Sequence, residues 1–193
     1  VRGEGDKSRV ATAGPNSSGG TALGAIAQAA GIDPKQIVYD GGNPAILATV
    51  SGEAQATTQL ALEQAEMIRA GRLKPLAAIG TTPIVLGDTT IHPIVEDLPN
   101  LPPSENFVGI YLPAGTPQEV VDTLTKAWVD VVSNSKDLAT LCQTRGCGVA
   151  PKAPAEALAA ADPLIRAAAW GLFERGEAKV SPDTLGIKKP GET

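Results

Sequence analysis

The sequence has few aromatic residues and few charges. Only 3% of its 193 residues are aromatic, 19% are charged, and the net charge is −5. So few aromatic side chains leave little surface on which sugars or bases can stack. The sixteen lysines and arginines are scattered along the chain rather than clustered. Both features argue against binding to nucleic acid.

Long apolar runs are also absent. No stretch approaches the roughly 18 consecutive apolar residues of a membrane-spanning helix, and no basic and then apolar signal sequence stands at Val1. We therefore expect no direct insertion of the chain into a membrane. A mature secreted domain has the same pattern, so the missing signal does not indicate the cytoplasm. Hydrophobic residues make up 42% of the sequence, which is enough for a folded chain with a buried core.

The residues of common enzyme and metal sites are scarce. The only histidine, His92, has no Cys, Asp or Glu beside it at metal-ligand spacing. A nucleophile at Ser17 or Cys142 would lack a nearby base, and neither a G-x-S-x-G motif nor a carboxylate pair at catalytic spacing is present. We therefore expect no catalytic residue, no metal ligand and no cofactor.

The sequence contains two cysteines. Cys142 and Cys147 are separated by four residues, which permits a small disulfide in an oxidising compartment. Two free thiols that pack as small apolar side chains fit the sequence as well. A catalytic redox pair more often has the spacing C-x-x-C, so these residues do not indicate a redox enzyme.

Two glycine-rich turns stand where predicted strands give way to helices. They cover residues 13–20 (AGPNSSGG) and residues 40–44 (DGGNP). Glycine lets backbone N–H groups approach a ligand closely, and serine or asparagine caps a helix whose N-terminus carries partial positive charge. In open α/β sheets such turns bind small ligands, so the pattern is compatible with an anion-binding site. Glycine-rich turns that serve packing alone have the same pattern, and the residues leave this alternative open.

The rest of the sequence alternates between helical and extended patterns. Helices are predicted over residues 21–30, 45–50, 60–70, 116–133, 135–144 and 154–175, the last interrupted at Asp162–Pro163. Strands are predicted over residues 8–12, 37–38, 52–59, 73–79 and 107–112. A long loop is expected over residues 80–106, and a tail that wraps the surface or is loose over residues 180–193.

Two of these helices have amphipathic patterns. The helix over residues 60–70 is expected to turn Leu62, Ala65, Met67 and Ile68 inward and Glu63, Glu66 and Arg69 outward. Residues 116–119 match a capping box with Pro117 at the first helical position. The helix that they open is expected to bury an apolar stripe of Val120, Val121, Leu124, Ala127, Trp128 and Val131.

Several blocks of the sequence resemble one protein family. Thr12-Ala13-Gly14 with Ser17-Ser18, then residues 30–32 (AGI) and 39–45 (YDGGNPA), resemble the blocks G-S-A-G-x-G-S-S, A-G-I and Y-K-G-G-x-P-A of the tripartite tricarboxylate transporter receptors, the TctC or Bug family. Residues 68–77 (IRAGRLKPLA) and 107–117 (FVGIYLPAGTP) resemble two later blocks, I-K-A-G-K-L-R-A-L-A and W-F-G-L-x-A-P-A-G-T-P. The gaps between the early blocks match without insertion, and the resemblance extends from about Val10 to Trp170.

The resemblance implies a fold and a division of the chain. The expected fold is α/β, periplasmic-binding-protein-like of type II, with one lobe plus the return segment of the other. Residues 1–104 would form the ligand-binding lobe, which is the second lobe of the receptor. Residues 105–193 would return to the first lobe and add C-terminal helices and a tail. The first strands of the family's first lobe have no counterpart in this sequence.

The resemblance also implies a function. The chain would be an extracytoplasmic solute-binding receptor, or a fragment of one, that delivers a small carboxylic acid to the subunits of a tripartite tricarboxylate-type membrane transporter. Its location would be the periplasm or the cell surface of a bacterium. The ligand-binding residues implied by the matching blocks are Thr12, Asn16, Ser17, Ser18, Gly42 and Gln59.

Two departures and two alternative functions qualify this hypothesis. Gln55 and Gln59 stand where the family has acids, which would make the site less hostile to anions, although Gln59 facing solvent fits the sequence equally. The alternative functions are a truncated interaction domain that binds no solute and self-associates through exposed surface, and a hydrolase-type enzyme. The sequence does not identify the acid.

Overall fold

The computed structural model describes residues 7–101 and 106–192 of the chain. The chain divides into two compact units. The first unit comprises Val1–Val108 and Lys136–Val149, and the second comprises Gly109–Ser135 and Ala150–Thr193. The boundary predicted between residues 104 and 105 lies outside the described residues.

The first unit is built on a parallel three-stranded sheet. Its strands are β1 (Arg9–Thr12), β2 (Lys35–Val38) and β3 (Ala56–Thr57), in the order β2-β1-β3. The middle strand β1 is buried from its second residue onward, as expected for a parallel strand covered on both faces. The strand predicted over residues 52–59 is wrong except at β3, because residues 51–54 form a turn in which the Ala54 N–H donates to the Ala48 carbonyl.

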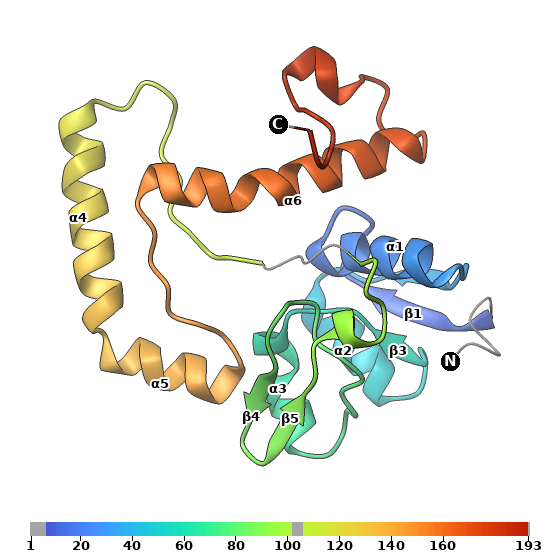
Figure 1. Cartoon of the computed structure of the whole chain (residues 1–193). Coiled ribbons are helices and arrows are strands. Elements are labelled where there is room, and N and C mark those ends of the chain that lie inside the picture. Colours follow the sequence, from blue (N-terminus) through green and yellow to red (C-terminus); the bar gives the residue numbers. More distant parts are fainter. Residues whose placement is uncertain (1–6, 102–105, 193) are drawn as a thin grey trace. The chain divides into compact units, whose positions relative to one another are not determined.

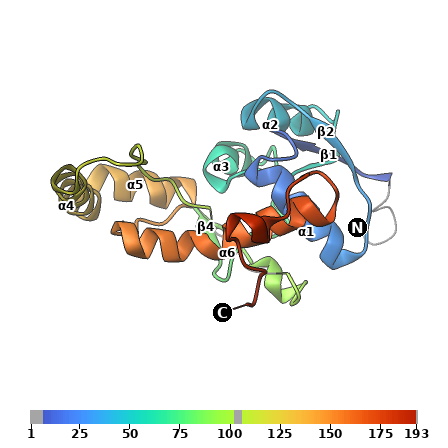
Figure 2. The ribbon, with the colours of Figure 1, turned by 90° about the horizontal axis from the view of Figure 1, so that it is seen from above.

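Three helices follow these strands in turn. They are α1 (Ser18–Ala30), α2 (Gly42–Val50) and α3 (Ala61–Arg69). The connections β1–α1–β2 and β2–α2–β3 run in opposite directions across the sheet, so α1 and α2 lie on opposite faces of it, as both ribbon views show (Figures 1 and 2). The end of α1 is as predicted, since Gly31 has φ 65° and closes the helix in the left-handed region.

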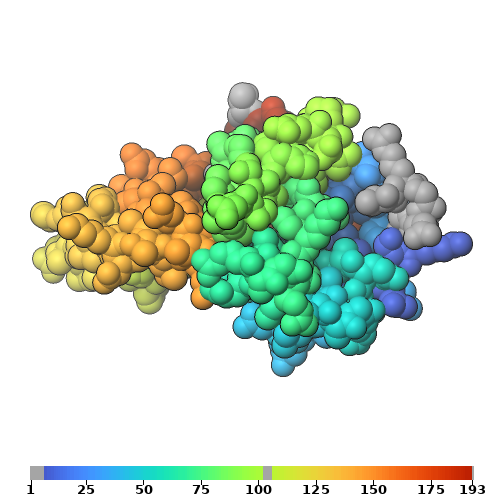
Figure 3. Space-filling model, turned by 90° about the horizontal axis from the view of Figure 1, so that it is seen from below, coloured from blue at the N-terminus to red at the C-terminus, as the bar shows by residue number. Residues whose placement is uncertain are grey.

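A β-hairpin lies within the segment predicted as a long loop. Its strands are β4 (Ile84–Leu86) and β5 (Thr89–Ile91), and the 3-10 helix η2 (Ile94–Glu96) follows. The strands are too short for a periodicity analysis to reveal, although Gly87-Asp88 is a typical two-residue hairpin turn. The hairpin and α3 share an apolar core of Ala65, Ile68, Ala78, Leu86 and Ile91. Their residues form one continuous green body in the space-filling view (Figure 3).

Two expectations about the neighbouring segments are wrong. Residues 73–79 form no strand, because only Ala78 pairs, in a single bridge with Pro93, and Leu76 remains 62% exposed. In α3, Ala65 and Ile68 are buried as predicted, whereas Leu62 is exposed. The helix is only nine residues long, so its buried stripe is narrower than the sequence pattern suggested.

His92 offers a direct test of the loop after β5. Its Nε2 lies 2.7 Å from Asp97 Oδ2, and this hydrogen bond raises the pKa of His92 above its ordinary value of 6.5. The pair therefore favours the folded state below pH 6.5, and this contribution is lost as the pH rises through the pKa of the folded protein. We expect Asp97→Asn to lower the pKa of His92, measured by NMR titration of this single histidine. Asp88→Asn is the control, and an unchanged pKa in Asp97→Asn would contradict the pairing.

Helix α5 (Lys136–Arg145) belongs to the first unit and packs beside α3. Arg69 Nη1 donates to the Thr144 carbonyl, and Arg145 Nη2 lies 3.3 Å from Glu66 Oε1. Glu66 also accepts from Arg69 at 2.6 Å, and this hydrogen bond lowers the pKa of Glu66. These contacts join the C-terminal ends of two helices that are far apart in the sequence.

A disulfide closes the end of α5. Cys142 and Cys147, whose Cα atoms are 4.5 Å apart, are bonded, so the first of the two alternatives left by the sequence is the observed one. The Cys147 N–H donates to the Cys142 carbonyl at 3.0 Å. Gly146 precedes Cys147, has φ 70° and packs against the hairpin. A Cβ atom at Gly146 would come within 2.9 Å of side-chain atoms of both Ile84 and Leu86. The disulfide therefore fixes a turn that rests on β4.

The second unit contains α4 (Gln118–Asn134), α6 (Pro154–Glu174) and the 3-10 helix η3 (Pro182–Leu185). The predicted capping box is wrong, because the Thr116 hydroxyl donates to the Pro113 carbonyl and Pro117 itself occupies the N-cap. Helix α6 passes through Pro163 without the predicted interruption. An ion pair of 2.6 Å between Asp162 and Arg166 spans this point.

The apolar stripe of α4 is not buried as predicted. None of the α4 residues is buried, and Val131 is 66% exposed. The segment 107–112 is likewise no strand, and its Val108 and Tyr111 are about 80% exposed. The second unit holds α4 and residues 109–112, and its described residues contain no strand with which these could pack or pair.

Candidate functional site

The candidate site lies at the carboxyl edge of the parallel sheet in the first unit. Each of the three strands ends there in a short loop that leads into the N-terminus of a helix. The chain order reverses between β1 and β3, because β1 is connected onward to β2 on one side and β3 is added on the other. In open α/β sheets, ligands bind outside the carboxyl ends of the strands at such a reversal.

The loop after β1 is held by Ser17. Its Oγ accepts a hydrogen bond from the Gly20 N–H at 3.0 Å and donates to the Gly14 carbonyl at 2.7 Å, so Ser17 is the N-cap of α1. Gly14 has φ 132°, a conformation that needs glycine. Ser18, the next residue, is half-buried in the first turn of the helix, where N–H groups have no partner within the helix. Asn16 is exposed at the tip of the loop.

The loop after β3 packs against the start of α1. The Thr58 hydroxyl donates to the Gly19 carbonyl at 2.7 Å, and a Cβ atom on Gly19 would overlap the Thr58 carbonyl oxygen. The Gln59 side-chain nitrogen is buried beside Gly19 and has no hydrogen-bond partner among the residues that the structure describes. The structure therefore brings Ser17, Ser18 and Gln59 to neighbouring positions around Gly19, with an unpaired donor among them.

Two other residues singled out from the sequence occupy different places. Thr12 is 0% exposed, and its hydroxyl accepts hydrogen bonds from the Gly14 N–H and from Gln36 Nε2 at 2.6 Å. It lies beneath the first loop, and its role toward a ligand stays a prediction. Gln55 Oε1 accepts from the Arg9 N–H at the start of β1, at the opposite edge of the sheet from Gln59.

An acidic residue, Glu63 of α3, lies beside the loop that follows β2, and the sequence did not indicate it as a site residue. Gly41 has φ 109°, whereas Gly42 has no positive φ and begins α2. The Glu63 carboxylate lies directly over Gly42, since its carbon would be 2.7 Å from a Cβ atom at this position. Glu63 was predicted to face outward and is instead half-buried. The only signal in the sequence that could have indicated Glu63 as a site residue was its place in the first turn of the helix that follows β3.

Among the residues that the structure describes, no group of three or more His, Cys, Asp or Glu side chains is placed to hold a metal ion. The predicted ligand residues offer hydroxyl, amide and backbone N–H groups, none of which carries a formal charge. Such a set suits a small polar ligand that is bound through hydrogen bonds.

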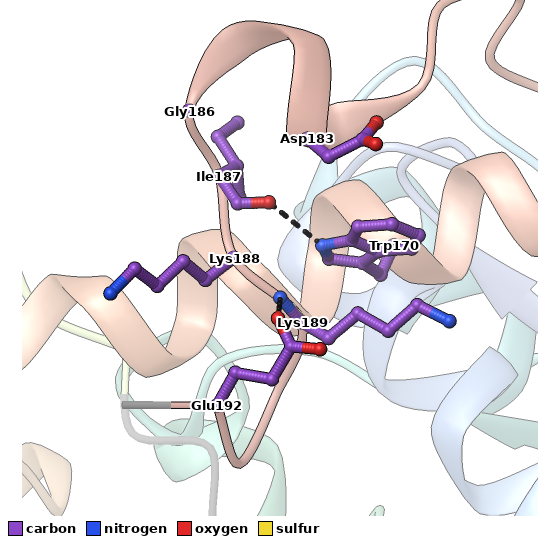
Figure 4. A pocket seen from close by; sticks show the side chains of 7 residues that line it. All are labelled: Trp170, Asp183, Gly186, Ile187, Lys188, Lys189 and Glu192. Carbon is purple, nitrogen blue, oxygen red and sulfur yellow. Dashed lines mark hydrogen bonds between the residues drawn. The ribbon is translucent and has the colours of Figure 1, made fainter.

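A pocket lies in the second unit, where the tail folds back on α6 (Figure 4). The pocket has a volume of about 370 Å³, and its lining residues are Trp170, Asp183, Gly186, Ile187, Lys188, Lys189 and Glu192. Trp170 Nε1 donates to the Ile187 carbonyl at 3.0 Å, and Lys189 Nζ lies 4.8 Å from the centre of the Trp170 ring. Of the two alternatives for the tail, a wrapped tail is therefore the observed one.

Three solved structures are similar to this chain. A periplasmic transporter matches with a TM-score of 0.77 and 19% identity over 94% of this chain and 59% of its own. A TctC solute-binding protein from Polaromonas matches with a TM-score of 0.67 and 24% identity over 91% and 60%. An R. palustris protein solved with adipate matches with a TM-score of 0.65 and 17% identity over 97% and 59%. The chain thus spans about 60% of the length of these neighbours.

These similarities define the class of fold. No family model and no curated protein sequence matches the chain. The structural neighbours share the α/β fold of TctC-type periplasmic solute-binding proteins, which confirms the fold class predicted from the sequence blocks. Within residues 7–101 and 106–192, no helix has the length and apolar character needed to cross a bilayer.

Proposed function

We propose that this chain carries the ligand-binding part of a periplasmic receptor for a small carboxylic acid, which it delivers to a tripartite tricarboxylate-type membrane transporter. The observation that carries the proposal is the cluster of uncharged donors at the carboxyl edge of the sheet. The buried amide nitrogen of Gln59, beside the first turn of α1, finds no hydrogen-bond partner in residues 7–101 and 106–192. A ligand carboxylate would supply the missing acceptor.

The proposed mechanism is reversible binding without covalent chemistry. The carboxylate lies at the N-terminus of α1, where the first-turn N–H groups and the helix dipole favour an anion. The Ser18 hydroxyl and the Gln59 amide add hydrogen bonds, directly or through water. The distance from Ser17 Oγ to the Gly14 carbonyl is 2.7 Å, so this hydroxyl supports the loop rather than the ligand.

Variants of the two adjacent serines, Ser17 and Ser18, allow the effect on ligand binding and the effect on stability to be measured separately. We expect Ser18→Ala to weaken carboxylate binding about tenfold, or about 1.4 kcal/mol, with unchanged stability. Ser17→Ala removes the N-cap and is expected to lower the free energy of unfolding by about 1 kcal/mol. Isothermal calorimetry with a panel of small carboxylates, and urea unfolding followed by circular dichroism, measure the two effects.

Ser133→Ala, an exposed serine of α4, is the control and should change neither quantity. If Ser18→Ala binds the panel as tightly as the original chain, the assignment of the site is wrong. If the original chain binds no carboxylate, the proposed function fails.

A second candidate function is an interaction domain that binds no solute. The exposure of Val108 and Tyr111, each about 80%, favours it, because exposed apolar segments without charges promote association of chains. Sedimentation velocity distinguishes the candidates. Self-association without ligand binding would support the interaction domain, and a monomer that binds a carboxylate would support the receptor.

A further inference from the structure

We propose that Glu63 restricts the ligand to acids with one carboxylate, whose remaining part is neutral or carries an amino group. This inference rests on the proposed function and narrows its substrate class. It starts from a contact of Gly42, one of the residues that the sequence blocks indicate as ligand-binding, with Glu63, which is not one of them.

The position of this contact follows from the order of the strands. Gly42 comes directly after the loop that follows β2, and Glu63 comes in the first turn of the helix that follows β3. Strand β1 lies between β2 and β3 in the sheet. The two groups in contact therefore follow the strands on either side of β1, and the carboxyl end of β1 leads into the loop that would hold the ligand carboxylate.

The missing side chain of Gly42 makes room for the acid. A Cβ atom at Gly42 would be 2.7 Å from both the carboxyl carbon and Oε1 of Glu63, which is closer than such atoms approach in proteins. The Glu63 carboxylate therefore fills the space at the start of α2, where a free anion would otherwise be favoured by the backbone N–H groups. This helix end already holds an anion that belongs to the protein.

Glu63 and Glu66 lie on the same helix and differ in their charged partners. Among the described residues, no ion pair joins Glu63 to a lysine, arginine or histidine, whereas Glu66 on the same helix is paired with Arg69 and Arg145. The predicted ligand residues carry no positive charge either. A second ligand carboxylate that extends toward α2 would meet like charge in a half-buried site, where repulsion is stronger than in water.

An amino or amide group on the ligand would have the opposite effect. It would donate a hydrogen bond to the Glu63 carboxylate, and an ammonium group would add charge attraction. The ligand class selected by this arrangement is a monocarboxylate with a neutral or amino-bearing far end. It excludes dicarboxylates, although one neighbour of similar fold was solved with adipate, a dicarboxylate.

Three acids of equal carbon number test the proposal. Calorimetry is carried out with hexanoate, 6-aminohexanoate and adipate on the 193-residue chain and on Glu63→Gln. In the original chain, we expect adipate to bind at least about tenfold more weakly than either monocarboxylate. In Glu63→Gln, adipate should gain about tenfold, hexanoate should change less than about twofold, and 6-aminohexanoate should lose about fivefold.

Glu119→Gln is the matched control, because it removes the same charge from the second unit and should leave all three affinities unchanged. Equal affinity of the original chain for hexanoate and adipate would overturn the role of Glu63 and leave the proposed function intact. If Glu63→Gln preferred hexanoate over adipate by the same factor as the original chain, the role of Glu63 would be overturned as well. Failure of all three acids to bind the original chain would refute the proposed function, and this inference with it.

Discussion

Replacing Gly19 by alanine is expected to destabilise the first unit by about 3 kcal/mol. A Cβ atom at this position would overlap the backbone carbonyl oxygen of Thr58 and come within 3.1 Å of the Gln59 amide nitrogen. A backbone carbonyl cannot rotate away as a flexible side chain can, so the loop after β3 has to move away from α1. Urea unfolding followed by far-ultraviolet circular dichroism measures the loss.

The same substitution at Gly80 is the control for Gly19→Ala. A Cβ atom on Gly80 would meet no atom within 4 Å, and its backbone has no positive φ. We therefore expect Gly80→Ala to change the free energy of unfolding by less than about 0.5 kcal/mol. If Gly19→Ala were as stable as Gly80→Ala, the close packing of the two loops would be incorrect, and so would the placement of Gln59 in the site.

Removal of the disulfide is expected to have the next largest effect on the first unit. The bond between Cys142 and Cys147 closes a loop of about six residues, for which the loss of chain entropy in the unfolded state corresponds to about 2 kcal/mol. We expect Cys142→Ala with Cys147→Ala to lower the free energy of unfolding by this amount. Amide hydrogen exchange should increase most at the end of α5, which the disulfide holds against β4.

A reducing agent provides the control for the cysteine variant. The original chain in the presence of a phosphine reductant should unfold at the same urea concentration as the variant. The variant itself should not respond to the reductant. If the original chain loses its disulfide, as shown by thiol labelling, and keeps its full stability, the expected contribution of the bond is wrong.

Local signals in the sequence were sufficient for the loop and helix that build the site. The end of α1 at Gly31 depends on neighbouring residues only, and the sequence predicted it correctly. The helix was predicted from residue 21, whereas it begins three residues earlier, at Ser18, after a cap by Ser17. The fold class was predicted from the order of several short blocks. Its confirmation comes from neighbours with 17–24% identity, at which only the fold is comparable.

The errors of prediction concern features that depend on distant partners. The segment 107–112 has an alternating apolar pattern and forms no strand, because a strand also needs a paired neighbour. The sequence pattern of α4 does contain an apolar stripe, but its residues are not buried, because burial needs a second surface to pack against. Glu63 was assigned to solvent from helical periodicity alone, whereas the absent side chain of Gly42, 21 positions earlier, is what allows the carboxylate to turn inward.

The distribution of the two tryptophans limits how ligand binding can be observed. Trp128 in α4 and Trp170 in α6 both belong to the second unit, whereas the candidate site lies in the first. Indole emission follows the local surroundings of each ring, and the Trp170 ring is enclosed by the C-terminal tail. A quenching titration of this chain would therefore report on the surroundings of these two rings in the second unit, namely α4 and the C-terminal tail.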